Sequence, residues 1–377
     1  MSSKECALCD RPITDENDSK EHLIPNAIGG RKKVFGFICN DCNNKSGKEW
    51  DSELARQLNP LSILFGISRE RGETPSHKVE TANGAQLRLY ANGSMEPVNP
   101  KYEENTTESG IKINIVARTI AEGKKMLAGV KRKFPQIDFD KIVNDIQSKE
   151  YYPEGMINLK MPSFGGHKAG RSIVKTCLAL AVESGVNPRI CEVARSYLLN
   201  GGEACFGYYY ERDLIKNRPE GVIFHCVSIE GNPDTKLLLG YVEYYSAQRM
   251  IICLSNEYEG EKFSRTYALN PMSGNEIELI INLSSLNQED IVATYKYEKI
   301  PKGSIEEAFS KIIPIGIELS FQKELERVLN KGMQYAFENC GAKEGENLTE
   351  EQIAKLPSLL MEKLKPFIIH QLRRPKC

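Results

Sequence analysis

Residues 6–9 read Cys-Ala-Leu-Cys, and residues 39–44 read Cys-Asn-Asp-Cys-Asn-Asn. In each pair two residues separate the cysteines, which lets both sulfurs face one ion from a tight turn. The 29 residues between the pairs are enough for a hairpin or loop that returns the second pair to the first. The spacing predicts a structural, four-thiolate zinc site made of Cys6, Cys9, Cys39 and Cys42. Coincidental thiols and a redox pair are the alternatives, but no thioredoxin-like βαβ pattern surrounds these cysteines.

The first 55 residues or so are rich in Asn, Gly, Cys and charge and lack long apolar runs. A unit of this size buries little core, and below roughly 40–60 residues a metal or disulfide usually supplies the missing stability. This composition favours a zinc-stapled module at the N-terminus.

The segment between the cysteine pairs carries Glu21-His22-Leu23-Ile24-Pro25 and then Gly29-Gly30, and Asn43 directly follows Cys42, the second cysteine of the second pair. In this order and spacing, residues 6 to about 51 resemble the HNH endonuclease family, whose ββα-metal fold is often braced by two Cys-x2-Cys pairs. The resemblance covers roughly an eighth of the chain. It implies a small treble-clef-like module that hydrolyses nucleic-acid phosphodiesters.

The resemblance also implies the role of each residue. His22 would be the general base, which suits an imidazole whose ordinary pKa of about 6.5 lies near neutrality. Glu21 and Asn43 would hold a catalytic Mg²⁺ or Mn²⁺, since hard cations prefer oxygen ligands. Asn44 is the alternative to Asn43 if the register shifts by one. Because neighbouring side chains on a strand point to opposite faces, Glu21 and His22 need a bend between them to share one pocket.

Two positions depart from the family pattern. Val34 stands where the family has its middle Asn, and Asn26 is a candidate to brace the loop after His22 instead. Gly47 stands where three-ligand members often have His, which leaves two protein ligands and favours a loosely held ion. The competing interpretation makes His22 a turn residue in a plain zinc knuckle.

Basic residues cluster near this segment. Arg31, Lys32 and Lys33 follow the Gly-Gly turn, and Lys45 and Lys48 lie on the expected helix after Cys42. They could grip phosphates without reading sequence. A solvated hairpin tip is an equal alternative, because residues 1–50 hold eight basic and eight acidic side chains.

The rest of the chain predicts an α+β fold. Helical spacing over 51–65 is interrupted by Pro60, which predicts two short helices there. Helices are also expected over 119–133, 138–147, 170–184 and 188–199. Five strands with short connections (222–229, 236–245, 250–254, 265–269 and 276–283) favour an antiparallel sheet. Capping signals at Ser304 and Thr349 precede a helical C-terminus.

We therefore expect three parts: an HNH module with structural zinc over 1–66, an α+β domain for recognition, sensing or partner contact over 67–300, and a helical segment over 301–377. The aromatic stretches 206–210 and 241–245, and His225 between Phe224 and Cys226, are expected to lie in the core. His167 precedes a helix and is a weaker candidate for phosphate contact.

Composition limits the partners. The chain has 377 residues, 27% of them charged, and a net charge of −1. Its overall charge therefore does not indicate a polyanionic partner such as nucleic acid. No apolar run suggests a membrane span or signal peptide, and a cytoplasmic protein is expected.

The sequence predicts a metal-dependent endonuclease acting on nucleic acid, with double-stranded DNA favoured over RNA. The resemblance to the HNH family also implies a setting in bacterial restriction or antiviral defence, and a homodimer or a partner protein from such a system is a further expectation. The alternative is a non-catalytic zinc module that docks on nucleic acid or protein.

Overall fold

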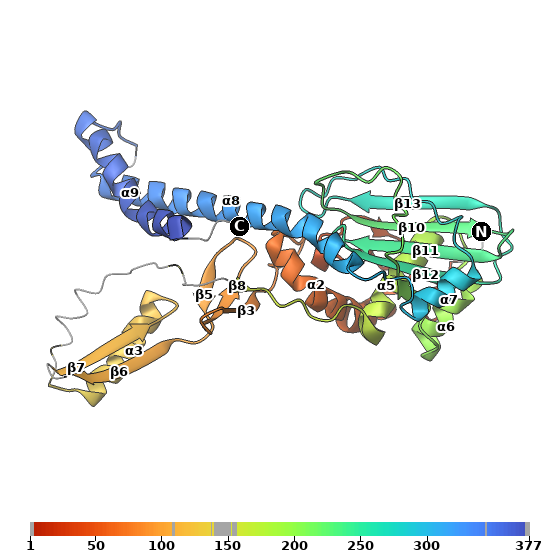
Figure 1. Cartoon of the computed structure of the whole chain (residues 1–377), viewed down its shortest axis with the longest axis horizontal. Coiled ribbons are helices and arrows are strands. Elements are labelled where there is room, and N and C mark those ends of the chain that lie inside the picture. The colour runs from red at the N-terminus through yellow and green to blue at the C-terminus, as the bar shows by residue number, and fades with distance from the viewer. Residues whose placement is uncertain are drawn as a thin grey trace. The chain divides into compact units, whose positions relative to one another are not determined.

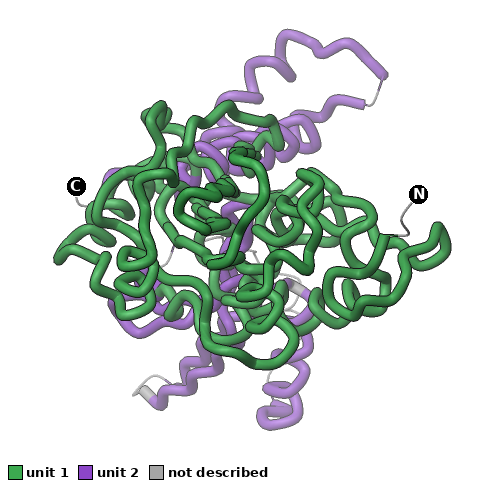
Figure 2. The backbone as a smooth tube through the Cα atoms, turned by 90° about the vertical axis from the view of Figure 1, so that its right-hand side faces the viewer, with its two compact units in different colours: residues 1–75, 161–319 green, residues 76–160, 320–377 purple. Residues whose placement is uncertain are grey.

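The computed structural model describes residues 4–107, 110–136, 138, 152, 157–343 and 345–373. They fall into two compact units, one of residues 1–75 and 161–319 and the other of residues 76–160 and 320–377, coloured separately in Figure 2. Each unit joins segments that are distant in sequence, and the predicted boundaries after residues 66 and 300 stay a prediction. The predicted fold class, α+β with antiparallel sheets and a helical C-terminus, is confirmed.

The first unit begins with a small two-stranded sheet and three consecutive helical segments. These are β1 (Glu21–His22), η1 (Asn26–Ile28), β2 (Lys33–Val34), α1 (Asn40–Ser46), the π-helix η2 (Gly47–Asp51) and α2 (Ser52–Leu64). The chain re-enters the unit with α5 (Gly166–Glu183), η3 (Pro188–Ile190), α6 (Glu192–Asn200), β9 (Phe206–Tyr208), β10 (His225–Asn232), β11 (Leu237–Tyr244), β12 (Gln248–Ser255), β13 (Phe263–Leu269) and α7 (Gln288–Tyr295).

A five-stranded sheet in the order β13-β10-β11-β12-β9, antiparallel throughout, forms the centre of this unit (Figure 1). Successive side chains on a strand point to opposite faces. Val227 and Val242 therefore pack in one cluster with α5, whereas Cys226 and Tyr241 pack in a second cluster with Ile291 of α7. Since both faces are covered, β10 and β11 are buried along their whole length.

The N-terminal module shares this core. Leu23, Phe37, Trp50 and Leu58 belong to the same buried cluster as α5 and one face of the sheet. After β1 the chain turns back through Gly29, which has a left-handed backbone (φ +99°). At Gly30 a Cβ would lie 1.7 Å from the carbonyl oxygen of Ile24, so only glycine fits there. The module is thus built onto the larger fold and is not a free-standing domain.

One predicted strand and one predicted helix break are wrong. Residues 276–283 form only isolated bridges, and the fifth strand is β9 instead. Leu279, Ile281 and Leu283 are buried in the second cluster, so this segment's apolar alternation covers a sheet face without extending the sheet. Likewise α2 runs unbroken through Pro60, which is buried among its neighbours. That packing compensates for a proline in a helix interior, which costs about 3 kcal/mol.

The second unit contains a four-stranded antiparallel sheet in the order β5-β4-β3-β8 and a separate hairpin, β6-β7. Val130 of helix α3 and Phe134, the residue that caps its C-terminus, pack on that hairpin. The elements are β3 (His77–Thr81), β4 (Gln86–Leu89), β5 (Met95–Pro97), β6 (Lys101–Thr107), β7 (Gly110–Val116), α3 (Ile120–Lys133), β8 (Ile157–Asn158) and α9 (Glu350–Arg373). Helix α8 (Ser304–Asn339) starts in the first unit and ends in the second. The helix predicted over 138–147 lies outside the described residues, apart from Asp138.

Within the part of the chain that the structure describes, no helix has the length and apolar character needed to cross a membrane.

His225 is a core residue, as predicted, and it joins the sheet to the N-terminal module. It is fully buried, and its Nδ1 accepts a hydrogen bond of 2.9 Å from the backbone N–H of Tyr245. Its Nε2 therefore carries the proton and donates to the carbonyl oxygen of Ile28 at 2.8 Å. Burial lowers the pKa of His225 to about 4, so the imidazole is neutral at pH 7.

This buried imidazole makes the fold sensitive to acid. Because the folded pKa lies below the unfolded value of about 6.5, the full stability is present above pH 6.5 and is lost as pH falls toward 4. Between pH 7 and pH 5 the free energy of unfolding should fall by about 2 kcal/mol through this group. His225→Gln keeps one donor and one acceptor without the titration. Denaturant unfolding of both proteins at the two pH values should show a steeper loss for the parent; equal losses would contradict the assignment.

Candidate active site and zinc-binding cluster

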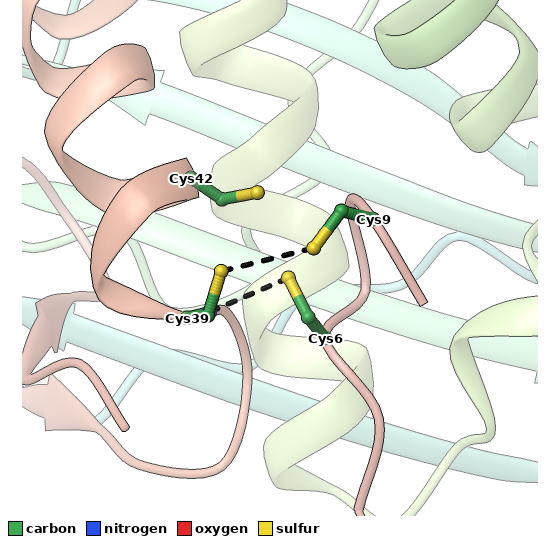
Figure 3. A group of neighbouring side chains, drawn as sticks. All are labelled: Cys6, Cys9, Cys39 and Cys42. Atoms are coloured by element: carbon green, nitrogen blue, oxygen red, sulfur yellow. Dashed lines mark hydrogen bonds between the residues drawn. The ribbon is translucent and has the colours of Figure 1, made fainter. Parts of the chain in front are cut away.

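Four cysteines converge at the edge of the N-terminal module (Figure 3). Cys6 and Cys9 lie in a turn, Cys39 is the N-cap of α1, and Cys42 lies in the first turn of that helix. All four Sγ atoms lie within 4.8 Å of one another, and those of Cys9 and Cys39 are 3.7 Å apart. Tetrahedral zinc, with Zn–S bonds of about 2.3 Å, requires sulfurs about 3.8 Å apart. The geometry and the soft donor set fit zinc.

Among the described residues, these cysteines are the one group of three or more His, Cys, Asp or Glu side chains arranged to hold a metal ion. Burial raises the pKa of the Cys6 and Cys42 thiols. A metal bound there would have to displace their protons.

Glu21 lies on β1, and its side chain points into the protein. Its carboxylate accepts a hydrogen bond of 2.5 Å from the ammonium of Lys175 on α5. The same ammonium donates to Asp51 at the end of η2 at 2.6 Å and lies 3.4 Å from the hydroxyl of Ser46 at the end of α1. Ser172, one turn before Lys175, donates to the other oxygen of Asp51 at 2.5 Å. Two carboxylates from the module thus enclose one lysine from a helix more than a hundred residues later.

Burial and charge act in opposite directions at this ion-paired group. The side chains of Lys175 and Glu21 are only 2% and 7% exposed. Burial raises the pKa of Glu21, and Lys175 opposes that rise. Burial by itself would lower the pKa of Lys175, but Asp51 and Glu21 outweigh it and raise that pKa. The ammonium is therefore charged at neutral pH and is held by its two partners.

His22 follows Glu21 on the strand but has different partners. Its Nε2 lies 3.2 Å from a carboxylate oxygen of Glu70, which also accepts a hydrogen bond of 2.9 Å from Lys33. Burial lowers the pKa of His22, although Glu70 opposes the shift, so the imidazole is neutral at pH 7. Glu21 and His22 thus face opposite sides of β1. Within the described residues no hydrogen bond links His22 to Glu21, Asn43 or Asn44.

Asn26 holds the loop between these two strands. Its side-chain amide donates to the carbonyl oxygen of Gly30 at 3.2 Å, and its Oδ1 accepts the backbone N–H of Glu70 at 3.2 Å. Asn26 therefore braces the loop after His22, as its position in the sequence suggested. It also positions the backbone of Glu70, whose carboxylate contacts His22.

The two asparagines after Cys42 lie on α1. Asn43 is half-buried and Asn44 is exposed. The backbone carbonyl of Asn43 accepts the hydroxyl of Ser46 at 3.2 Å, which places this turn of α1 next to the Lys175 group. The Asn43 carboxamide has no hydrogen-bond partner among the described residues.

The predicted basic cluster divides into two groups. Arg31 donates to the carbonyl oxygen of Ser68, Lys32 pairs with Glu183 at 3.0 Å, and Lys33 pairs with Glu70. Lys45 and Lys48 are exposed on α1 and η2. The first three side chains have partners inside the protein, and the last two are directed to solvent.

The remaining candidates from the sequence behave as structural or surface residues. Tyr209, Tyr210, Tyr241, Tyr244 and Tyr245 are buried, which confirms their predicted place in the core. His167 is exposed at the start of α5, beside a cavity of about 390 Å³ that Arg56 and Lys168 also line. That cavity is not lined by any residue of the Glu21-His22 segment.

Asp51, Glu70 and Lys175 were missed from the sequence. The sequence does indicate that Lys175 is unusual, because it is the one charged residue in an otherwise uncharged helical stretch, residues 172–182. A lysine in such surroundings indicates a buried ion pair. Its partners could not be named from the sequence.

Comparison with known proteins finds a match for the segment that holds the cysteine pairs and the Glu21-His22 pair. A family model described as HNH endonuclease matches residues 6–59. No curated protein and no solved structure matches the chain. The match spans both cysteine pairs, β1, β2, α1 and η2, and it ends within α2. Residues 6–59 are therefore an HNH endonuclease-family module, with a four-cysteine cluster suited to zinc and joined to a larger α+β fold.

Proposed function

We propose that this chain is a metal-dependent endonuclease that hydrolyses phosphodiester bonds of nucleic acid, with DNA as the favoured substrate. The observation that carries the proposal is the Glu21-His22 pair on β1, inside a cysteine-braced module that matches the HNH endonuclease family. In this proposal zinc at Cys6, Cys9, Cys39 and Cys42 has a structural role, because a four-thiolate site leaves no open position for substrate.

His22 is the proposed general base. Its contact with Glu70 uses Nε2, so a proton on that nitrogen leaves the Nδ1 lone pair to accept a proton from water. A carboxylate in this position fixes the tautomer and stabilises the imidazolium that forms. Burial keeps His22 neutral at pH 7, which is the state a base requires.

Glu21 and Asn43 are the proposed ligands of a catalytic Mg²⁺ or Mn²⁺, with Asn44 as the alternative on α1. Their oxygen donors suit a hard cation. Such an ion would polarise the phosphate and stabilise the departing oxygen. Glu21 and His22 face opposite sides of β1 in this structure. The proposal therefore requires the Glu21 carboxylate to leave Lys175 and rearrange before metal and base can act on the leaving and attacking sides of one phosphate.

Substrate contact is proposed for the exposed Lys45 and Lys48, which lie on the two helical segments after Cys42. Arg31, Lys32 and Lys33 already have partners, so they would contribute through long-range charge. Two lysines give weak, sequence-blind binding. Because such binding is weak, we propose that the chain works as a homodimer or with a partner protein. The proposed substrate is double-stranded DNA, and the proposed setting is a restriction or antiviral system in the cytoplasm.

One observation favours a second candidate, a non-catalytic zinc module that docks on nucleic acid or protein. The carboxylate proposed as a metal ligand already holds the ammonium of Lys175. If that pair is permanent, Glu21 is a structural residue.

Cleavage of supercoiled plasmid by the full-length chain tests the proposal. We expect nicked or linear product with Mg²⁺ or Mn²⁺ and none with EDTA. The full chain is required because partners of the module, Lys175 and His225, lie outside residues 1–75. DNA binding without product at any metal concentration would favour the docking module.

A further inference from the structure

We propose that Lys175 is a built-in competitor for the divalent ion at Glu21, so that the ion binds there only when the lysine side chain leaves. This inference rests on the proposed function, because it concerns the carboxylate proposed to hold the metal. It assigns a metal-excluding role to α5, which lies outside the segment that matches the HNH family.

The ammonium lies where three elements of the module converge. Glu21 comes from β1, Ser46 from the end of α1 and Asp51 from the end of η2, and the Nζ atom of Lys175 is 2.5, 3.4 and 2.6 Å from their oxygens. Three oxygens around one cationic centre are the surroundings that a hard metal ion also prefers. Lys175 therefore supplies a positive charge at the position where the module would otherwise need a metal.

Burial makes this competition strong. Lys175 is 2% exposed, so its charge is tolerated only because Glu21 and Asp51 compensate for lost hydration. Glu21, 7% exposed, needs a cation for the same reason. An arriving divalent ion must break an unscreened ion pair and is repelled by an ammonium at contact distance. The two cations therefore exclude each other at this carboxylate.

The position of Lys175 is fixed by two further contacts between the module and α5. Gln57 on α2 donates to the carbonyl oxygen of Gly165 at 2.9 Å and accepts the N–H of Gly165 at 2.8 Å, immediately before α5. Ser172 on α5 holds Asp51 at 2.5 Å. The lysine is thus presented by a helix that is attached to the module at two points before it, at Gly165 and at Ser172. The Asn43 carboxamide, in contrast, has no partner among the described residues and could accept a metal at once.

Direct measurement of Mn²⁺ affinity tests the inference without relying on cleavage. Free Mn²⁺ is followed by electron paramagnetic resonance in titrations of the zinc-loaded, full-length chain. Lys175→Met should bind Mn²⁺ at least tenfold more tightly than the parent, and adding Glu21→Gln should remove the gain. Lys175→Arg, which keeps the charge, should bind as weakly as the parent. Lys168→Met removes an exposed lysine two turns earlier on the same helix and should change nothing.

Lys175→Met leaves two carboxylates buried without their cation and could fail to fold. The double variant Lys175→Met with Asp51→Asn removes one charge of each sign, and the same tenfold gain is expected from it. Unchanged Mn²⁺ affinity in a folded variant overturns the inference, even if the parent cuts DNA. A gain in Mn²⁺ binding at Glu21 without any cleavage supports the inference and overturns the proposed nuclease.

Discussion

Removing the zinc is expected to unfold the N-terminal module while the five-stranded sheet persists. The structural metal of zinc-finger peptides contributes about 10–16 kcal/mol of apparent binding energy, and here the four cysteines fix the turn at Cys6 to the start of α1. Without that link, the side chains of Phe37 and Ile38, which are buried in the folded protein, should become exposed to solvent. The same result is expected from a chelator and from Cys42→Ser.

The single tryptophan provides the measurement. Trp50 lies in η2, is 6% exposed and packs beneath the guanidinium of Arg171. Its fluorescence should shift to longer wavelength when zinc is removed, and zinc should restore it. Cys340→Ser, a buried cysteine on the second unit, is the matched control and should keep both zinc and the signal. A Trp50 spectrum that does not respond to metal would contradict a stapling role.

The second large effect is on catalysis. His22→Ala is expected to lower metal-dependent cleavage by about 10²- to 10⁴-fold, the usual contribution of a positioned general base. The imidazole is partly exposed, with 22% of its side-chain surface accessible, so the fold should tolerate its loss. Zinc content and Trp50 fluorescence should therefore match those of the parent.

Single-turnover cleavage of a labelled DNA duplex gives the required comparison. Glu70→Gln should cause a smaller loss, because it weakens the orientation of His22 without removing the base. His167→Ala replaces an exposed histidine elsewhere in the same unit and serves as the control. Full activity of His22→Ala would remove His22 from the mechanism and leave the docking module as the better account.

The zinc cluster could be predicted from the sequence because the evidence for it is local. Two residues between cysteines suffice to direct both sulfurs at one ion, and only the return of the chain had to be assumed. The antiparallel sheet was also predictable, since β10, β11, β12 and β13 follow one another with short connections. The segment 276–283 has the same alternation but covers a face of the sheet, and alternation alone does not distinguish these two outcomes.

The partners of the Glu21-His22 pair could not be predicted, because tertiary packing selects them. Strand geometry indicated that the two side chains point to opposite faces unless a bend intervenes, and the structure has no such bend. Which groups contact them depends on residues 48 positions after His22 and 154 positions after Glu21. The domain boundaries after 66 and 300 stay a prediction, but the shared core ties the module to α5 and the sheet.

The location of a bound divalent ion is the most direct test of the whole account. Crystals of the Lys175→Met, Asp51→Asn chain, soaked in Mn²⁺, should give an anomalous peak at the manganese edge, below the energy at which zinc contributes. We expect that peak at coordination distance from the Glu21 carboxylate and the Asn43 carboxamide, on the module that carries His22. A saturating soak with no ion beside Glu21 would contradict the account.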